Sequence, residues 1–175
     1  MLEAYQADLA ALAARDRLRA LAPRAGLDFA SNDYLALAAS PELAAAAQAA
    51  LARGVPVGAG GSRLLRGNHP EHEALEEEAA AFFGAQRALF FGAGFSANEA
   101  LLATLPQRDD LILHDALIHA SAHDGMRLSR APRHAFAHND AGAVEAAIRD
   151  WRGKGGVGRV WIVVESLYSM DGDTA

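Results

Sequence analysis

Cysteine is absent from this 175-residue chain, which excludes disulfide bonds and thiolate metal sites. Lysine is nearly absent as well, because Lys154 is the only one and it lies in a glycine-rich turn, residues 153–156. No apolar run is long enough to cross a membrane, and the charged, amphipathic N-terminus does not resemble a signal peptide. With 16 basic and 22 acidic residues, the net charge is −6 and no basic stripe is available for nucleic acid. We therefore expect a cytoplasmic protein that binds neither nucleic acid nor membranes.

Strands and short helices alternate through the second half of the chain. The patterns predict strands at 88–91, 110–113, 134–137 and 160–164, and helices at 96–105, 117–128 and 141–151. Such an alternation predicts right-handed βαβ crossovers and a mainly parallel sheet that is covered by helices. The last strand is apolar throughout, which is typical of a strand buried on both faces. The expected fold class is α/β.

The first half has fewer regular elements. Helical periodicity predicts helices over 2–21, 41–53 and 71–83, with a short strand at 27–30 and an irregular glycine-rich segment at 54–67. Ser40 is a good N-cap, because proline and an acidic residue follow it. Gly84 is the residue type that commonly follows a helix end.

A glycine-rich turn joins the strand at 88–91 to the helix that follows it. Gly92 and Gly94 allow a tight turn and a close backbone approach, and Ser96 and Glu99 have the spacing of a capping box. The free N–H groups at such a helix start favour an anion, most plausibly a phosphate. The alternative is a plain strand–helix turn in which the glycines serve geometry alone.

The same turn also fits a dinucleotide enzyme. Gly92, Gly94 and Ala97 match the relaxed fingerprint, and Asp115 follows at a spacing suited to a ribose-binding acid. A fingerprint strand is normally the first of its domain, however, whereas nearly ninety residues precede this one. A nicotinamide- or flavin-dependent oxidoreductase therefore stays open as an alternative from this motif alone.

Histidines near the second strand raise two possible uses. Asp115, His119 and His123 are spaced by four, so on one helix they would share a face and form a weak metal site. His69 and His72 are a second weak candidate pair. Because no general-base Glu lies between His119 and His123, we expect no metal site. We predict instead that His119 presents a flat aromatic surface to a planar cofactor.

Seven segments, in order along the chain, resemble motifs of the α-oxoamine synthases, which are pyridoxal-phosphate (PLP) enzymes of the aspartate-aminotransferase fold. These segments are residues 27–35, 58–63, 67–76, 91–98, 115–125, 138–140 and 165–173. The resemblance implies an N-terminal helix and substrate-contacting segment over residues 1–40. It implies that residues 41–175 are the first part of a large three-layer α/β/α cofactor-binding domain.

The resemblance is greatest to the branch of this family that serves biotin synthesis. It rests on Ser62-Arg63-Leu64 after the double glycine and on the acidic helix near Leu75. It implies a homodimeric acyltransferase that condenses L-alanine with a pimeloyl thioester, of CoA or a carrier protein, and releases CO2. Glycine-using relatives, of the glycine C-acetyltransferase (2-amino-3-ketobutyrate ligase) and 5-aminolevulinate synthase types, are the alternatives within the family.

Site residues also follow from the resemblance, one position at a time. Gly94 and Phe95 would offer backbone N–H groups to the cofactor phosphate, and His119 would stack on the pyridine ring, where it also meets the substrate. Ser169 would lie beside the phenolic oxygen of the cofactor. Asn32 would lie near the amino-acid carboxylate, and Arg19, or alternatively Arg17, would meet the acyl substrate.

Three family features have no counterpart in the chain. The lysine that forms a Schiff base with the cofactor, the acid that pairs with the pyridine nitrogen and the small C-terminal domain would all lie beyond Asp173. Lys154 matches none of them. In this family the Schiff-base lysine both holds the cofactor and moves a proton during catalysis. We therefore expect this chain to be the N-terminal portion of such an enzyme and to be inactive by itself.

Overall fold

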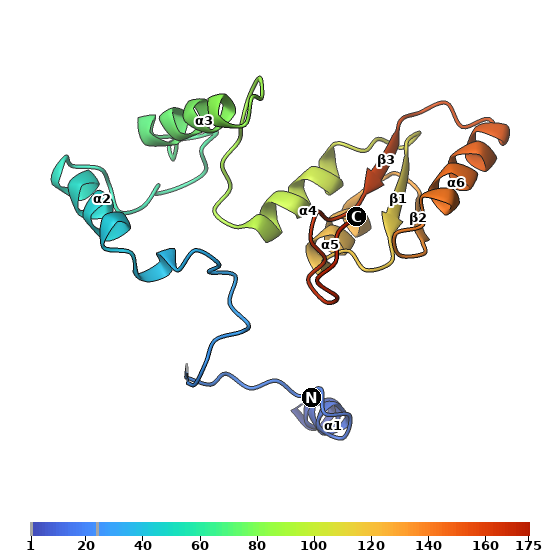
Figure 1. The fold of residues 1–175 in the computed structure, drawn as a ribbon, viewed down its shortest axis with the longest axis horizontal. Coiled ribbons are helices and arrows are strands. Elements are labelled where there is room, and N and C mark those ends of the chain that lie inside the picture. Colours follow the sequence, from blue (N-terminus) through green and yellow to red (C-terminus); the bar gives the residue numbers. More distant parts are fainter. Residues whose placement is uncertain (1, 24) are drawn as a thin grey trace. The chain divides into compact units, whose positions relative to one another are not determined.

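A computed structural model of the protein describes residues 2–23 and 25–175 (Figure 1). Contacts divide the chain into two compact units, Met1–Ser62 and Arg63–Ala175. Each unit is described by itself. Among the described residues, no helix is long and apolar enough to span a membrane.

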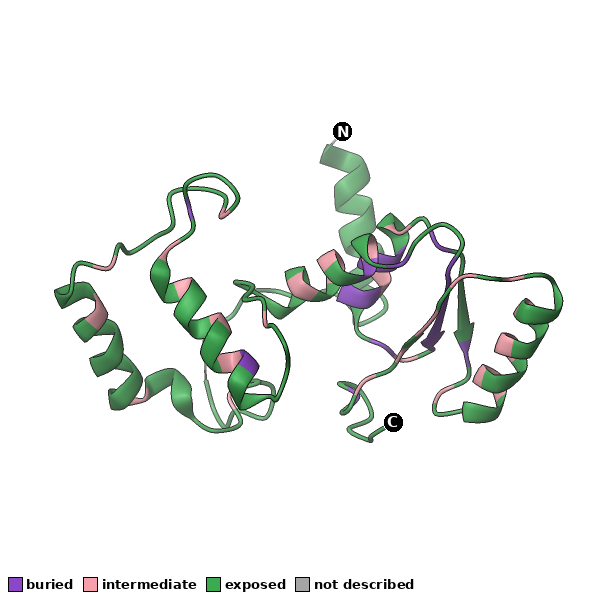
Figure 2. Ribbon diagram, turned by 90° about the horizontal axis from the view of Figure 1, so that it is seen from above, coloured by how far each residue is buried: buried purple, intermediate pink, exposed green. Residues whose placement is uncertain are grey.

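The first unit contains helix α1 (Leu2–Ala13), the short 3-10 turn η1 (Leu37–Ala39) and helix α2 (Pro41–Ala52). The predicted cap of α2 is confirmed, because the Ser40 hydroxyl accepts a hydrogen bond from the backbone N–H of Leu43 at 3.2 Å. No described residue of this unit is buried, as the colouring of Figure 2 also shows. Its helices are therefore stabilised by local hydrogen bonds.

Two predictions for the first unit are wrong. Helix α1 ends at Ala13, well before residue 21, because Asp16 adopts a left-handed φ of 54° and the Arg17 N–H bonds back to the Leu12 carbonyl. Residues 27–30 form no strand in the described chain. The Asp28 carboxylate there accepts the backbone N–H groups of Ala30 and Ser31, which closes a turn.

The second unit is built around a parallel sheet. It contains helices α3 (Pro70–Phe82), α4 (Gly94–Thr104), α5 (Ala120–Leu128) and α6 (Ala141–Gly153), with strands β1 (Leu111–Asp115), β2 (Arg133–Phe136) and β3 (Val160–Val163). The strand order is β2-β1-β3, and both pairs are parallel. In the register, Leu113 of β1 lies opposite His134 of β2 and Ile162 of β3. The predicted α/β class with a parallel sheet is confirmed.

Helices cover both faces of this sheet (Figure 1). Ile112 of β1 points toward α4 and α5, where it packs with Leu102 and Met126. The neighbouring Leu111 and Leu113 point the other way and pack against α6. Because side chains alternate along a strand, one short strand supplies both cores of a three-layer α/β/α arrangement.

Two strand predictions for this unit need correction. Residues 88–91 are not a strand in the described chain, and the Phe90 N–H instead donates to the Glu76 carboxylate at 2.8 Å. Strand β3 is only partly buried, and Ile162 keeps 51% of its surface exposed. All five residues of β1 are buried, because β1 is the strand with a hydrogen-bonded neighbour on each side.

Candidate cofactor site

Helix α4 begins at Gly94 without a side-chain cap. Its N-cap is Ala93, and no acidic residue stands in its first turn. The predicted capping box of Ser96 and Glu99 is wrong, because the helix begins two residues earlier than that box requires. Nothing lies within 4 Å of the position where a Cβ on Gly94 would be. The first N–H groups of α4 are thus suited to an anion such as a phosphate.

His119 is the N-cap of α5, and its ring lies beside the start of α4. The ring centroids of His119 and Phe95 are 6.2 Å apart, with an angle of 78° between their planes. The ring nitrogen Nδ1 accepts the backbone N–H of Ser121 at 3.2 Å and lies 2.8 Å from the Ser121 hydroxyl. Because Nδ1 accepts a bond from a permanent donor, hydrogen bonding assigns the ring proton to Nε2.

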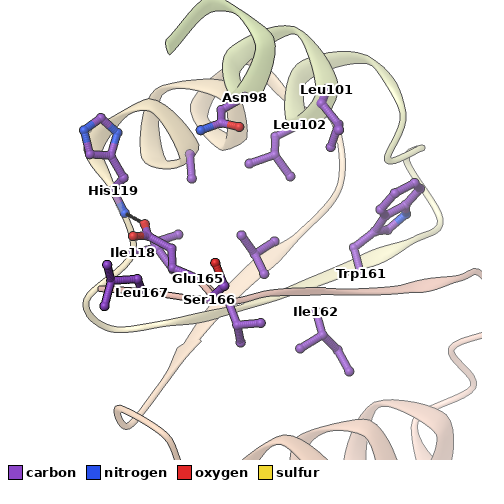
Figure 3. A pocket seen from close by; sticks show the side chains of 13 residues that line it. Asn98, Leu101, Leu102, Ile118, His119, Trp161, Ile162, Glu165, Ser166 and Leu167 are labelled. Carbon is purple, nitrogen blue, oxygen red and sulfur yellow. Dashed lines mark hydrogen bonds between the residues drawn. The ribbon is translucent and has the colours of Figure 1, made fainter. Parts of the chain in front are cut away.

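Two further residues, Asn98 and Glu165, help to hold His119 in place. Asn98 of α4 donates from Nδ2 to the hydroxyl of the fully buried Ser121 at 3.0 Å. The Glu165 carboxylate, which follows β3, accepts the backbone N–H of His119 (Figure 3). Segments from three parts of the chain therefore fix both the backbone and the ring of one histidine. Sequence reasoning gave no role to Ser121, Asn98 or Glu165.

A glycine sets how closely α4 and α5 approach. A Cβ on Gly125 would lie 2.8 Å from the Glu99 carbonyl oxygen and 3.0 Å from the Leu102 side chain. Such distances are shorter than van der Waals contacts allow, so any larger residue would push the helices apart. The hydrogen bond between Asn98 of α4 and Ser121 of α5 depends on this close packing.

A pocket opens next to His119, between α4, α5 and β3 with the segment after it. Figure 3 shows apolar walls from Leu102, Ile118 and Trp161, with Asn98 and Glu165 as polar groups near His119. The pocket therefore combines an apolar lining with a few convergent polar groups, which is usual for small-molecule sites.

Asp115, at the carboxyl end of β1, is fully buried, and both of its carboxylate oxygens have hydrogen-bond partners. It accepts the backbone N–H groups of Leu117 and Asn139, both at 2.8 Å, and His138 Nδ1 lies 2.9 Å away. Burial raises the pKa of Asp115, but these bonds outweigh it and lower the pKa to about 2. Asp115 is thus a structural anion and is unavailable to a ribose.

The segment after β3 returns to this buried carboxylate. His138 Nε2 lies 2.9 Å from Asp173 Oδ2, and the amide of Asn139 donates to the same oxygen at 3.2 Å. The buried Tyr168 ring is edge-on to the His138 ring, with 4.5 Å between the ring centroids. The Tyr168 hydroxyl lies beside Asp115 without a hydrogen bond of ordinary geometry. Hydrogen bonds to Asp115 and then Asp173 raise the pKa of His138.

The candidate metal ligands are not brought together. Asp115 belongs to a strand and His119 is a helix cap, so the two do not share a helix face with His123. His123 packs against His114 at 5.2 Å, and burial followed by the charge of His114 lowers its pKa. Over residues 2–23 and 25–175, no three metal-binding side chains gather at one point.

The other histidine pair caps a helix. His69 accepts the Glu71 N–H, and His72 accepts the His69 N–H, both at 3.2 Å. The two rings therefore form a capping box at the start of α3.

The remaining predicted residues lie on exposed segments. Arg17, Arg19 and Asn32 are exposed in irregular parts of the first unit, and Ser169 is exposed in a turn of the second. Their roles stay predictions. Lys154 lies at the end of α6, where its Nζ pairs with Asp150 at 2.7 Å on the surface.

The model of one protein family, "Aminotransferase class I and II", matches residues 24–175. The chain belongs to the aminotransferase class I and II family. This is a family of pyridoxal-phosphate enzymes, so membership favours that interpretation over the dinucleotide alternative.

Curated relatives place the chain more narrowly. It is 48% identical over 145 residues to 8-amino-7-oxononanoate synthase of Citrifermentans bemidjiense, covering 83% of this chain and 36% of that one. The match to the enzyme of that name from Acidithiobacillus ferrooxidans is 40% over 190 residues, covering 99% and 48%. The predicted resemblance is confirmed, and the chain spans less than half the length of these relatives.

Solved structures support the same fold. Sphingomonas wittichii serine palmitoyltransferase superimposes with a TM-score of 0.72 at 32% identity, over 82% of this chain and 35% of that one. The 8-amino-7-oxononanoate synthase of Francisella tularensis gives 0.65 at 29% identity, over 85% and 39%. A further serine palmitoyltransferase of the same kind was solved with PLP, with a TM-score of 0.72 at 29% identity, over 82% and 35%. The expected aminotransferase-type architecture is therefore confirmed.

Proposed function

We propose that the protein carrying this chain is a PLP-dependent acyltransferase that condenses L-alanine with a pimeloyl thioester. The reaction would release CO2 and the thiol and yield 8-amino-7-oxononanoate. The observation that carries the proposal is the His119 ring, held by hydrogen bonds beside the uncapped start of α4. The names of the curated relatives support the choice of alanine and pimeloyl thioester.

The described residues would meet the cofactor at three places, its phosphate, its ring and its phenolic oxygen. The N–H groups of Gly94 and Phe95 would bind the phosphate, because α4 begins there without a cap or an acid to compete. The face of His119 would lie against the pyridine ring, and Ser169 would bind the phenolic oxygen. When bound, the cofactor supplies an electron sink that acidifies the α-hydrogen of the amino acid.

The chain's own task would be to bind and orient. Ser121 keeps Nδ1 of His119 occupied as an acceptor, so the ring presents its Nε2–H outward. Asn32 would bind the carboxylate of alanine, and Arg19 would bind the acyl substrate. Holding reactants in a near-attack geometry is the contribution that such groups make to the rate.

The same proposal includes the organisation of the protein. We propose that residues 1–40 form a substrate-contacting segment and that residues 41–175 begin the cofactor-binding domain. We further propose that the protein is a cytoplasmic homodimer. Light scattering of the purified protein would test the dimer, and a mass of one polypeptide would contradict it.

An assay of amino-acid preference tests the activity. The protein carrying this chain is incubated with PLP, pimeloyl-CoA and L-alanine, glycine or L-serine in turn, and the products are identified by mass spectrometry. We expect alanine to be the preferred amino acid, with CO2 released. Preference for glycine or serine would contradict the proposal in favour of another family branch.

Two variants and the chain alone sharpen that assay. His119→Ala should lower kcat/KM by at least about tenfold through lost orientation. His134→Ala, on an exposed position of β2, should leave it unchanged. The 175-residue chain alone should be inactive, because it lacks the Schiff-base lysine of the family. Robust condensation of alanine with pimeloyl-CoA by the chain alone would contradict this expectation.

A further inference from the structure

His138 faces a carboxylate with each of its two ring nitrogens. Nδ1 lies 2.9 Å from Oδ1 of Asp115, and Nε2 lies 2.9 Å from Oδ2 of Asp173. A neutral imidazole carries one N–H and one lone pair, so one of its nitrogens would point a lone pair at a carboxylate oxygen. Only the imidazolium donates from both nitrogens.

The surroundings favour that charged form. Asp115 reaches the ring from the end of β1, and Asp173 reaches it from the C-terminal loop. The ring centroids of Tyr168 and His138 are 4.5 Å apart with their planes nearly perpendicular, and Asn139 adds an amide next to Asp173. Two carboxylates thus face one cation, and the groups that complete the cluster carry no positive charge.

The loop that Asp173 belongs to is closed on itself. The Tyr168 N–H donates to the Asp173 carbonyl and the Gly172 N–H donates to the Tyr168 carbonyl, both at 2.9 Å. Gly172 has a φ of 73°, which glycine tolerates. Ser169 sits inside this small ring of backbone bonds, so fixing Asp173 fixes the position of Ser169 as well.

We propose that His138 is a positioning residue, which as an imidazolium joins the end of β1 to the loop 168–173 and so places Ser169. We call this pair of hydrogen bonds, from His138 to Asp115 and to Asp173, the clamp. The role of Ser169 in catalysis rests on the proposed function, but the clamp itself does not. Hydrogen bonds to Asp115 and Asp173 raise the pKa of His138, so the clamp persists to a higher pH than an ordinary histidine would allow and is released as pH rises through that raised value.

Histidine ring NMR of the 175-residue chain tests the charge state. We expect two ring N–H signals for His138 at pH 6 and a titration midpoint above the ordinary value of about 6.5. A single neutral tautomer at pH 6 would overturn the proposal. No cofactor is added, so this result is independent of whether the proposed acyltransferase activity is found.

Asp173→Asn tests the clamp with little risk to the fold, because 45% of the Asp173 side chain is exposed. Asp171→Asn is the matched control, since it removes the same charge from the same loop without touching His138. We expect Asp173→Asn to lower the pKa of His138 and to speed amide exchange at Gly172 about tenfold, as for a lost charged hydrogen bond. The control should change neither.

A second variant separates charge from shape. His138→Gln keeps an amide near Asp115 but cannot donate to both carboxylates as a cation, so we expect the same faster exchange at Gly172 with β1 amides still protected. Equal exchange in all variants would overturn the proposal. Loss of protection in β1 as well as the loop, in Asp173→Asn, would also overturn it, because the bond would then hold the whole unit.

Discussion

The two units of the chain differ in how far apart along the sequence their hydrogen-bonded residues lie. In the first, Asp28, Asp33 and Ser40 bond to backbone groups at most five residues away, and no described residue is buried. In the second, the His119 backbone bonds to Glu165 and the Arg159 backbone bonds to Asp110, 46 and 49 positions apart. The candidate cofactor site lies in the second unit, where distant segments fix each other.

This difference has a physical consequence for function. A residue held by local bonds keeps the freedom of its segment, whereas His119 is held from α4, from α5 and from the segment after β3 at once. Orientation to within a fraction of an ångström requires the second kind of support. We therefore expect changes in the second unit to cost much more than changes in the first.

The largest contrast should come from Ile112→Ala. Ile112 is fully buried in β1, the middle strand of the sheet, so we expect a loss of about 3 kcal/mol of unfolding free energy. Leu43→Ala in α2, where Leu43 is 54% exposed, should cost less than about 0.5 kcal/mol. Urea unfolding followed by amide signals of each unit measures both, and similar losses would contradict the contrast.

Gly125→Ala should be the next largest change. Its new Cβ would meet the Glu99 backbone at 2.8 Å, and we expect overpacking to cost about 2 kcal/mol. Gly153→Ala is the matched control, because nothing lies within 4 Å of its Cβ position and alanine favours helix by about 0.5–1 kcal/mol. Thermal unfolding compares them, and a neutral Gly125→Ala would show that α4 and α5 pack less closely than described.

The stability of the second unit should fall both at low pH and at high pH. The pKa of Asp115, at about 2, is below the ordinary Asp value, so its stabilisation is present above about pH 4 and is lost as pH falls toward 2. The pKa of His138 is raised, so its contribution is present below about pH 6.5 and is lost as pH rises through the raised value.

Urea midpoints of the second unit, measured from pH 2 to 9, test this expectation. We expect a maximum between about pH 4 and 6.5, set by the two ordinary values. In Asp173→Asn, the fall on the alkaline side should become smaller. A midpoint that stays constant between pH 2 and 4 would contradict the role given to Asp115.

A smaller effect than that of Gly125→Ala should come from Ser40→Ala. Loss of this cap should cost about 1 kcal/mol of local helix stability in α2, because one N–H at the helix start loses its acceptor. Ser40→Thr keeps the hydroxyl and should cost little. Amide exchange in α2 measures the effect, and a change that spreads to β1 would contradict a purely local role for this cap.

Local signals in the sequence were sufficient for most elements. Ser40 and Pro41 located the start of α2, and Gly84 located the end of α3. The alternation of strands and helices located β1 and β3, and β3 is also a continuous apolar run. The strands predicted at 27–30 and 88–91 are wrong, because a strand also needs a partner, and a sequence pattern does not report whether one is present.

The site was only partly predictable for the same reason. Gly94, Phe95 and His119 came from a glycine-rich turn, a histidine position and a family resemblance, and the fold brings Phe95 and His119 together. Ser121, Asn98 and Glu165 were missed, since a single serine, amide or acid has no distinctive spacing. His138 belonged to a segment that resembled the family, yet its two carboxylate partners lie 23 and 35 positions away.

The central claim is that the start of α4 and His119 together form a cofactor site. The most direct test is NMR titration of the chain with pyridoxine 5′-phosphate, which carries the ring and phosphate but forms no Schiff base. We predict shifts of the Gly94 and Phe95 amides and of the His119 ring, with smaller shifts for pyridoxine, which lacks the phosphate. Unchanged signals at these three residues, or equal shifts with both compounds, would contradict the account.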